Sequence, residues 1–190
     1  MITQSNFDQL RIELSVKAKN GLDFIVAASI VWLIISYLWT LCYTAYDKSI
    51  LTFCVGAIML PLALLLSKVF KTNWKMKHNP LSPLGLWLNF AQLFYFPFLF
   101  FVLLKLPDHF VMVYVIITGA HFFPYSWYYK NKLYAFAAGI TSVGAFVLGI
   151  YLPIDKIYMI PLLMSALLIV LAILLHFDVR QKLKNYNPTA

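Results

Sequence analysis

The side chains of this sequence best suited to bind a ligand lie in two long apolar segments, where polar residues are uncommon. Six of them recur at helical spacing: Asn89, Gln92, Tyr114, Thr118, His121 and Tyr125. Residues three or four apart share a helical face, so the two amides form one polar face and the other four residues form a second. Amide, hydroxyl and imidazole groups can together bind a small polar molecule or an ion. The pattern therefore predicts a substrate-binding polar layer.

His121 is the ionisable member of this layer. Ionisable groups within a membrane are costly and often functional, but a neutral imidazole that hydrogen-bonds Asn89 or Gln92 would serve packing equally well. At a rise of about 1.5 Å per residue, the imidazole and the two amides reach similar depths in the inner half of a bilayer. A ligand-binding role and a structural role for His121 both stay open.

Catalytic and metal sites are not indicated. The sequence has no GxxxxGK[ST] loop, no GxGxxG, no CxxC, no HExxH and no GxSxG. No pair of carboxylates lies inside an apolar segment, which argues against a glycoside hydrolase. The histidines and aspartates of one side are scattered and lack metal-ligand spacing: His78, His121, His176, Asp23 and Asp178. We expect no catalytic residue, no metal and no cofactor.

The elements that carry these side chains must be membrane helices. The chain is 62% hydrophobic and only 12% charged, whereas soluble domains are about 45–50% apolar and about 25% charged. Spanning a bilayer as a helix takes about 20 apolar residues. The sequence therefore predicts an all-α polytopic bundle with six transmembrane helices at residues 22–44, 50–70, 84–104, 110–123 (continuing past Pro124 to Tyr128), 133–152 and 157–177.

The basic residues predict how the bundle is oriented. With the N-terminus in the cytoplasm, all but three of the 15 Lys and Arg residues lie inside, and Lys48, Lys105 and Lys156 lie outside. This asymmetry follows the positive-inside rule and predicts a cytoplasmic membrane protein with both termini in the cytoplasm. We expect the basic loops to bind anionic headgroups and no nucleic acid.

The segments flanking the bundle are short. In residues 1–21, Phe7, Leu10 and Leu14 fit one helical face, which predicts an amphipathic helix lying on the inner leaflet. A docking arm for a cytosolic partner is the alternative. Residues 22–177 form the transmembrane domain, and residues 178–190 are expected to form a basic cytoplasmic tail.

Three further features have two interpretations each. Asp23 opens the first span, where the helix dipole stabilises a carboxylate, and a proton or cation role is the alternative. Two buried free thiols are favoured over a disulfide for Cys42 and Cys54. Small residues four apart in span five indicate close packing within the chain or a homodimer interface: Ala135/Gly139, Ala138/Ser142 and Ala145/Gly149.

Three blocks of the chain carry a resemblance to a known family: GLDFIVAASIVWLI (residues 21–34), NPLSPLGLWLNFAQLFYFP (79–97) and VMVYVIITGAHFFPYSWYYK (111–130). They resemble an uncharacterised family of small multi-pass bacterial membrane proteins, a domain of unknown function. The resemblance implies a bacterial inner-membrane protein and no particular activity. Seven-helix ceramidase-like hydrolases do not match, because the span count and the histidine-and-aspartate pattern differ.

Three functional hypotheses follow. The first is a transporter or binding protein for a small molecule or ion, with its site in the polar layer. The second is a non-catalytic sensor, assembly or resistance factor that binds lipid or a protein partner through the aromatic and basic inner rim. The third is an intramembrane lipid-modifying enzyme with His121 as base, which we rank last because no nucleophile accompanies it.

Overall fold

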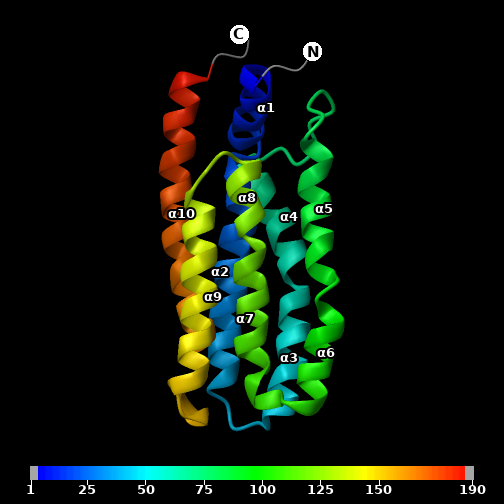
Figure 1. Ribbon diagram of the computed structural model, residues 1–190, viewed down its shortest axis with the longest axis vertical. Coiled ribbons are helices and arrows are strands. Elements are labelled where there is room, and N and C mark those ends of the chain that lie inside the picture. The colour runs from blue at the N-terminus through cyan, green and yellow to red at the C-terminus, as the bar shows by residue number, and fades with distance from the viewer. Residues whose placement is uncertain (1–3, 187–190) are drawn as a thin grey trace.

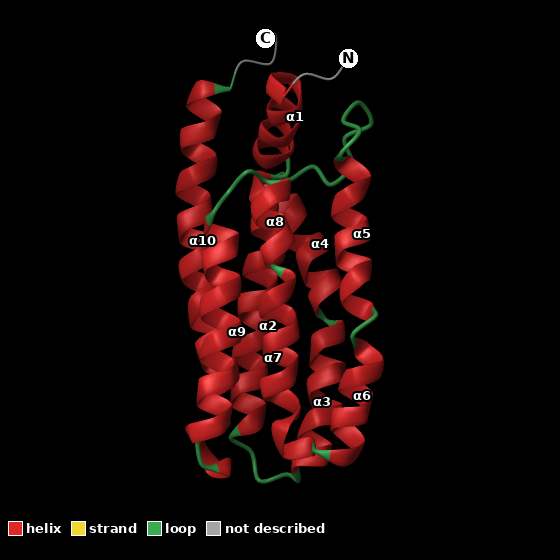
Figure 2. Cartoon of the chain, viewed as in Figure 1, coloured by secondary structure: helices red, strands yellow, loops and turns green. Residues whose placement is uncertain are grey.

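The computed structural model describes residues 4–186, with side chains from residue 6 onward, and in this range helices run side by side and no strand occurs (Figures 1 and 2). The helices are α1 (Gln4–Lys17), α2 (Leu22–Trp39), α3 (Ala45–Ala57), α4 (Met59–Phe70), α5 (Ser82–Leu93), α6 (Phe96–Lys105), α7 (Phe110–His121), α8 (Phe123–Tyr128), α9 (Leu133–Tyr151) and α10 (Met159–Asn185). The short 3-10 turns η1 (Lys19–Gly21), η2 (Pro107–His109) and η3 (Ile154–Lys156) complete them.

Six of the helical stretches described are long and apolar enough to cross a membrane: Lys19–Trp39, Ala45–Phe70, Ser82–Lys105, Pro107–Tyr128, Leu133–Tyr151 and Ile154–Asn185. The predicted all-α bundle with six such helices is confirmed. The first ends at Trp39 and not at residue 44, because Thr44 caps the next helix. Its hydroxyl oxygen accepts a hydrogen bond from the Asp47 backbone N–H at 3.1 Å, as N-cap residues do.

Three of these spans are interrupted just before a proline. The breaks between α3 and α4, between α5 and α6, and between α7 and α8 precede Pro61, Pro97 and Pro124. Proline has no backbone N–H, so the hydrogen bond to the residue four positions earlier is missing. The break expected at Pro124 is present, and those at Pro61 and Pro97 have the same cause.

The two ends of the bundle differ in composition. One end, called the basic end here, is formed by α1, residues 71–81, residues 129–132 and the last turns of α10, and the opposite end by residues 40–44, 106–109 and 152–156 (Figure 1). The basic residues assigned to the cytoplasm belong to these segments or adjoin them, as Lys19 in η1 and Lys68 in the last turn of α4 do. Which end faces the cytoplasm stays a prediction.

The N-terminal segment forms a helix, but α1 projects from the basic end along the long axis instead of lying across it (Figure 1). Leu14 is fully buried against the bundle. Arg11 donates a hydrogen bond to the Trp127 carbonyl at 2.6 Å and lies 4.9 Å from that indole ring. Lys130 pairs with Asp8 at 2.8 Å. These contacts hold α1 to the protein itself, which explains its departure from the predicted orientation.

The last helix is also longer than expected. α10 continues through residues 178–185, which were expected to belong to the tail, and residues 187–190 lie outside the described range. No proline or glycine interrupts residues 178–185. Asp178 and Lys182 pair at 2.8 Å one helical turn apart, which supports the helix.

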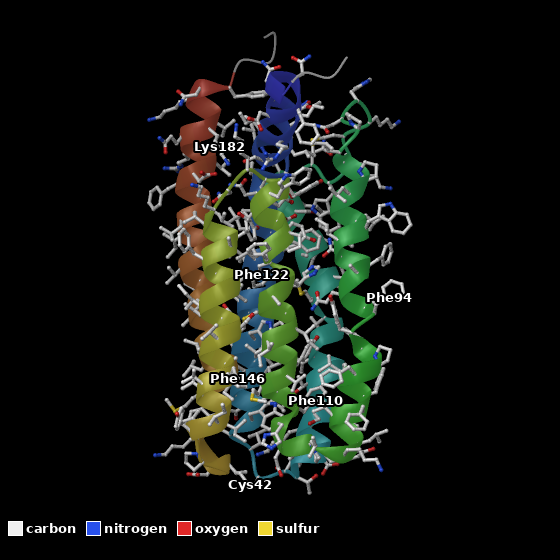
Figure 3. All side chains as sticks on the ribbon, viewed as in Figure 1. Cys42, Phe94, Phe110, Phe122, Phe146 and Lys182 are labelled. Atoms are coloured by element: carbon white, nitrogen blue, oxygen red, sulfur yellow. The ribbon has the colours of Figure 1, made fainter. Side chains whose placement is uncertain are left out.

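The centre of the bundle is α2, whose buried face packs chiefly against α10 and α4. Phe110 and Phe122 are buried, whereas Phe94 and Phe146 are exposed on the outside of the bundle (Figure 3). Exposed apolar side chains cover the spans on all sides, and Phe94 reaches 84% exposure. A surface of this kind is suited to lipid.

Small residues bring α7 and α9 together inside the chain. Ala138 and Ala145 of α9 are buried, and Gly119 of α7 faces Thr141. By contrast, a Cβ added to Gly139 would meet no atom within 4 Å. Packing within the chain therefore uses much of the small-residue face of span five. A homodimer through the unoccupied surface around Gly139 stays a prediction.

The two cysteines are free thiols, but both are exposed. The expectation that they would be buried was wrong, because Cys42 lies in the turn between α2 and α3 and Cys54 lies on the outward face of α3.

A pair of glycine substitutions tests the contact between α7 and α9. A Cβ added to Gly119 would lie 2.8 Å from Thr141 Cγ2 and 3.0 Å from Ser142 Oγ. We expect Gly119→Ala to lower stability by about 1–3 kcal/mol through overpacking. The matched control Gly139→Ala should leave stability equal or higher, because alanine favours the helix. Thermal unfolding in detergent measures both, and equal melting temperatures would contradict the packing.

The acidic residues of α1 make its docking dependent on pH. A hydrogen bond from Lys130 is the main cause that lowers the pKa of Asp8. Burial alone would raise the pKa of Glu13, but hydrogen bonds from Lys17 and Asn79 outweigh it and lower that pKa. A lowered pKa in the folded state means stabilisation that is present above the unfolded-state pKa and lost as the pH falls through the folded-state value.

We therefore expect α1 to remain docked above the ordinary pKa values of Asp8 and Glu13, which are 3.8 and 4.5, and to loosen as the pH falls below them. Fluorescence of Trp127, identified by subtracting the Trp127→Phe variant, reports the contact. The double variant Asp8→Asn, Glu13→Gln should give the loosened signal at neutral pH. A signal in that variant identical to the wild type would refute the role of the carboxylates.

Candidate functional site

The predicted polar layer lies where α5 meets α7 and α8. The Gln92 amide donates a hydrogen bond to Thr118 Oγ1 at 3.3 Å, and that hydroxyl donates to the Tyr114 carbonyl at 2.9 Å. Two of the six predicted residues, Gln92 and Thr118, are therefore joined across the two helices, and the Tyr114 carbonyl is a backbone acceptor one turn before Thr118. Thr118 is buried and Gln92 half-buried, so the contact lies inside the bundle.

Tyr125 and Asn89 meet at the backbone of α5. The Tyr125 hydroxyl and the Asn89 amide both direct a hydrogen bond to the Gly85 carbonyl, at 3.5 and 2.9 Å. A Cβ at Gly85 would lie 2.8 Å from the Tyr128 hydroxyl, so glycine permits the close approach of α8. The Asn89 side chain is exposed, which places it at the edge of the layer and not in its interior.

His121 lies at the end of α7, next to the break before Pro124. Its ring meets Tyr125 edge-on, with 5.4 Å between the ring centroids. The buried Nε2 atom has no hydrogen-bond partner among the described residues. The structure therefore joins Gln92 to Thr118, and Tyr125 to the Gly85 carbonyl that Asn89 also contacts. The Tyr114 ring packs instead against Trp32 and Phe53 of α2 and α3, and neither amide is a partner of the buried His121 Nε2.

A second group of polar residues, buried except for the half-buried Asp178 and Lys182, lies at the basic end and was not predicted as a site. We call it the buried polar cluster: Ser15, Asn20, Asp23, Tyr129, Tyr134, Asp178 and Lys182. It joins α1, η1, the start of α2, the segment between α8 and α9, and α10. Ser15, Asn20 and Asp23 have no exposed surface.

Asn20 connects the two terminal helices of the chain. Its Oδ1 accepts a hydrogen bond from Ser15 at 2.5 Å, and its Nδ2 donates to Asp178 at 2.7 Å. The Tyr134 hydroxyl donates to the Asn20 carbonyl. The Asn20 backbone has φ 54°, a left-handed conformation that asparagine adopts more readily than most residues.

Lys182 completes the connection from α10, where Figure 3 labels it. Its ammonium pairs with Asp178 at 2.8 Å and donates to Ser15 at 2.9 Å and to the Tyr129 carbonyl at 3.2 Å. Burial raises the pKa of Tyr129, and the neighbouring charge of Tyr134 raises it further. The phenol therefore stays neutral at physiological pH.

Asp23 lies in the first turn of α2, as predicted, and is fully buried. Its Oδ2 accepts hydrogen bonds from Thr72 at 2.7 Å and from the Trp74 indole at 2.5 Å. Its Oδ1 has no partner among the described residues. The loop that follows α4 thus folds over the start of the first span.

Sequence spacing could not reveal this cluster, because Ser15 and Lys182 are 167 positions apart. The available signals were local: the Asn20-Gly21 pair before the first span, and a carboxylate at its start. Among the described residues no three His, Cys, Asp or Glu side chains gather around a common point, so the scattered residues considered for zinc are not brought together.

Replacing Asn20 tests the cluster. We expect Asn20→Ala to lower stability by about 2–4 kcal/mol, because two buried hydrogen bonds are lost and Ser15 and Asp178 lose a partner. Lys71→Ala is the matched control. Lys71 also has a left-handed backbone, at φ 53°, but its side chain is exposed, so its loss should change stability by less than about 0.5 kcal/mol. Thermal unfolding in detergent compares the two, and equal losses would show that the side chain of Asn20 contributes nothing.

Comparison with known proteins places the chain in a family without assigning it an activity. No curated protein and no solved structure matches the sequence. Residues 7–178 match the sequence model of a family described as "Family of unknown function (DUF7010)". The match runs from α1 into the last turns of α10 and covers the polar layer entirely. Because it covers most of the chain, the protein belongs to this family of unknown function, DUF7010.

Proposed function

We propose that this multi-pass membrane protein binds a small polar molecule or an ion at the polar layer and carries it across the membrane. The observation that supports the proposal most directly is His121, whose Nε2 is buried and unpartnered between two spans. Polar groups buried in a membrane are normally paired. An imidazole nitrogen without a protein partner is suited to bind a ligand.

The breaks in the spans support the same proposal. Gln92 lies directly before the break between α5 and α6, and His121 directly before that between α7 and α8. Transporters often bind their substrates at discontinuous helices, where backbone groups are released from helical pairing. Both polar side chains are therefore placed where backbone groups can join them in binding.

The loose attachment of α5 supplies a means of opening. None of its described side chains is buried, and polar contacts such as Gln92–Thr118 and Tyr128–Ser82, at 3.3 Å each, join it to α7 and α8. Segments with few buried apolar contacts open at low cost. We propose that α5 moves relative to α7 and α8 to admit the ligand.

The two alternative functions have less support. The aromatic and basic rim that would bind a lipid or protein partner is occupied within the chain, since Trp127 and Lys130 hold α1 and the Tyr129 carbonyl accepts from Lys182. For a lipid-modifying enzyme, His121 has no carboxylate partner and contacts the Tyr125 ring. We also propose, on charge grounds, that both termini lie in the cytoplasm. The bacterial cytoplasmic membrane is proposed from the family resemblance alone.

Native mass spectrometry of the detergent-purified protein tests the binding site. We expect the wild type to retain a defined small mass and His121→Ala to lose it, because losing one hydrogen bond to a buried ligand weakens binding by about tenfold or more. His176→Ala is the matched control, since His176 is an exposed histidine in the C-terminal half of α10. Once the mass is identified, uptake into proteoliposomes should fall by a similar factor in His121→Ala alone. Equal retention by all three proteins, or no bound mass in any, would argue against the site.

A further inference from the structure

Asp23 is the only acidic residue among the described residues that is fully buried. Its neighbours in the buried polar cluster are balanced, because Asp178 pairs with Lys182 at 2.8 Å. The ion pairs of the described residues involve Asp8, Glu13 and Asp178, and none includes Asp23. The buried charge of Asp23 is therefore left without a cationic side chain.

The hydrogen bonds of Asp23 satisfy only half of the carboxylate. Thr72 and Trp74 donate to Oδ2 at 2.7 and 2.5 Å, and the first turn of α2 adds its dipole. Nothing among the described residues donates to the buried Oδ1. A buried charge is stable only when it is both paired and hydrogen-bonded, so this oxygen is suited to hold a positive ion.

Two further oxygens lie next to Gly21, just before the start of α2. A Cβ built on Gly21, two residues before Asp23, would lie 3.1 Å from the Tyr129 hydroxyl and 3.5 Å from the Tyr134 hydroxyl. The Tyr134 hydroxyl uses its proton on the Asn20 carbonyl, which leaves its lone pairs free to face a cation. Burial raises the pKa of Tyr129, and the charge of Asp23 contributes to that rise, so the two groups interact.

We propose that Asp23 Oδ1 binds a monovalent metal cation such as Na⁺, beneath the loop that carries Thr72 and Trp74. One carboxylate balances one positive charge. Calcium and zinc sites use several carboxylate, histidine or cysteine ligands, and no three such side chains gather among the described residues.

Trp74 controls access to this site. Its indole donates to Asp23, and its ring packs on Phe24 with 4.7 Å between the ring centroids. Displacement of this half-buried side chain would expose the carboxylate to the basic end of the bundle. The cation site is separate from the polar layer of α5, α7 and α8. The proposal of a cation site therefore does not depend on whether the polar layer binds a transported molecule.

Thermal unfolding of the purified protein at constant pH and ionic strength tests the proposal, with NaCl replaced stepwise by N-methylglucamine chloride. We expect the melting temperature of the wild type to rise with Na⁺, and above the dissociation constant to rise in proportion to the logarithm of the Na⁺ concentration. Asp23→Asn removes the charge and should melt at the same temperature at every Na⁺ concentration. Asp178→Asn is the matched control: it removes a carboxylate of the same cluster that already has a lysine, so the response to Na⁺ should persist.

A second measurement does not depend on any variant of Asp23. Titration of the wild type with NaCl should change its tryptophan fluorescence until the site is saturated, because the Trp74 indole donates to the Asp23 carboxylate. The Trp74→Phe variant should lack that change. A wild-type melting temperature indifferent to Na⁺ would overturn the proposal. So would a response retained in Asp23→Asn, or a melting temperature that follows pH but not Na⁺, which would assign the site to a proton.

Discussion

The constraint on which this structure depends is that lipid offers no hydrogen-bond partner to the chain. Every polar group between the two ends must find a partner within the protein, and the described contacts follow from that. Ser165 donates to the Ser29 carbonyl and Ser36 to the Tyr158 carbonyl, so that α10 is tied to α2 by its polar atoms as well as by its apolar ones. The apolar side chains are free to face outward, since lipid solvates them.

Under the same constraint, a buried polar atom without a partner is costly and needs an explanation. Among the described residues, Nε2 of His121, Oδ1 of Asp23 and Nδ2 of Asn131 are buried without a partner. His121 lies at the end of α7, beside the break before Pro124, and Asp23 lies under a loop at the basic end. Helix breaks and loops are where a membrane bundle can move without losing its core.

The basic residues at the basic end have two roles, the predicted orientation in the membrane and contacts within the protein. Its lysines and arginines indicate orientation, yet several of them hold the structure together. Arg11 binds Trp127, Lys130 binds Asp8, and Lys182 closes the buried polar cluster. Such charged groups are only partly available to lipid headgroups. This dual use explains why α1 stands on the bundle, since a helix with these partners gains more from the protein than from the membrane surface.

The sequence by itself determined the all-α class, the six spans and the break before Pro124, because apolar length and the missing N–H of proline act locally along the chain. It also suggested six residues for a polar layer, since helical spacing places them on shared faces, and that assignment stays a prediction. Only the tertiary structure decided that Gln92 meets Thr118, that Tyr125 and Asn89 share the Gly85 carbonyl, and that Asn20 joins Ser15 to Asp178. These contacts join residues far apart in the chain, and which helix lies beside which depends on close approaches such as Gly119 against Thr141. Local periodicity carries no information about such pairings.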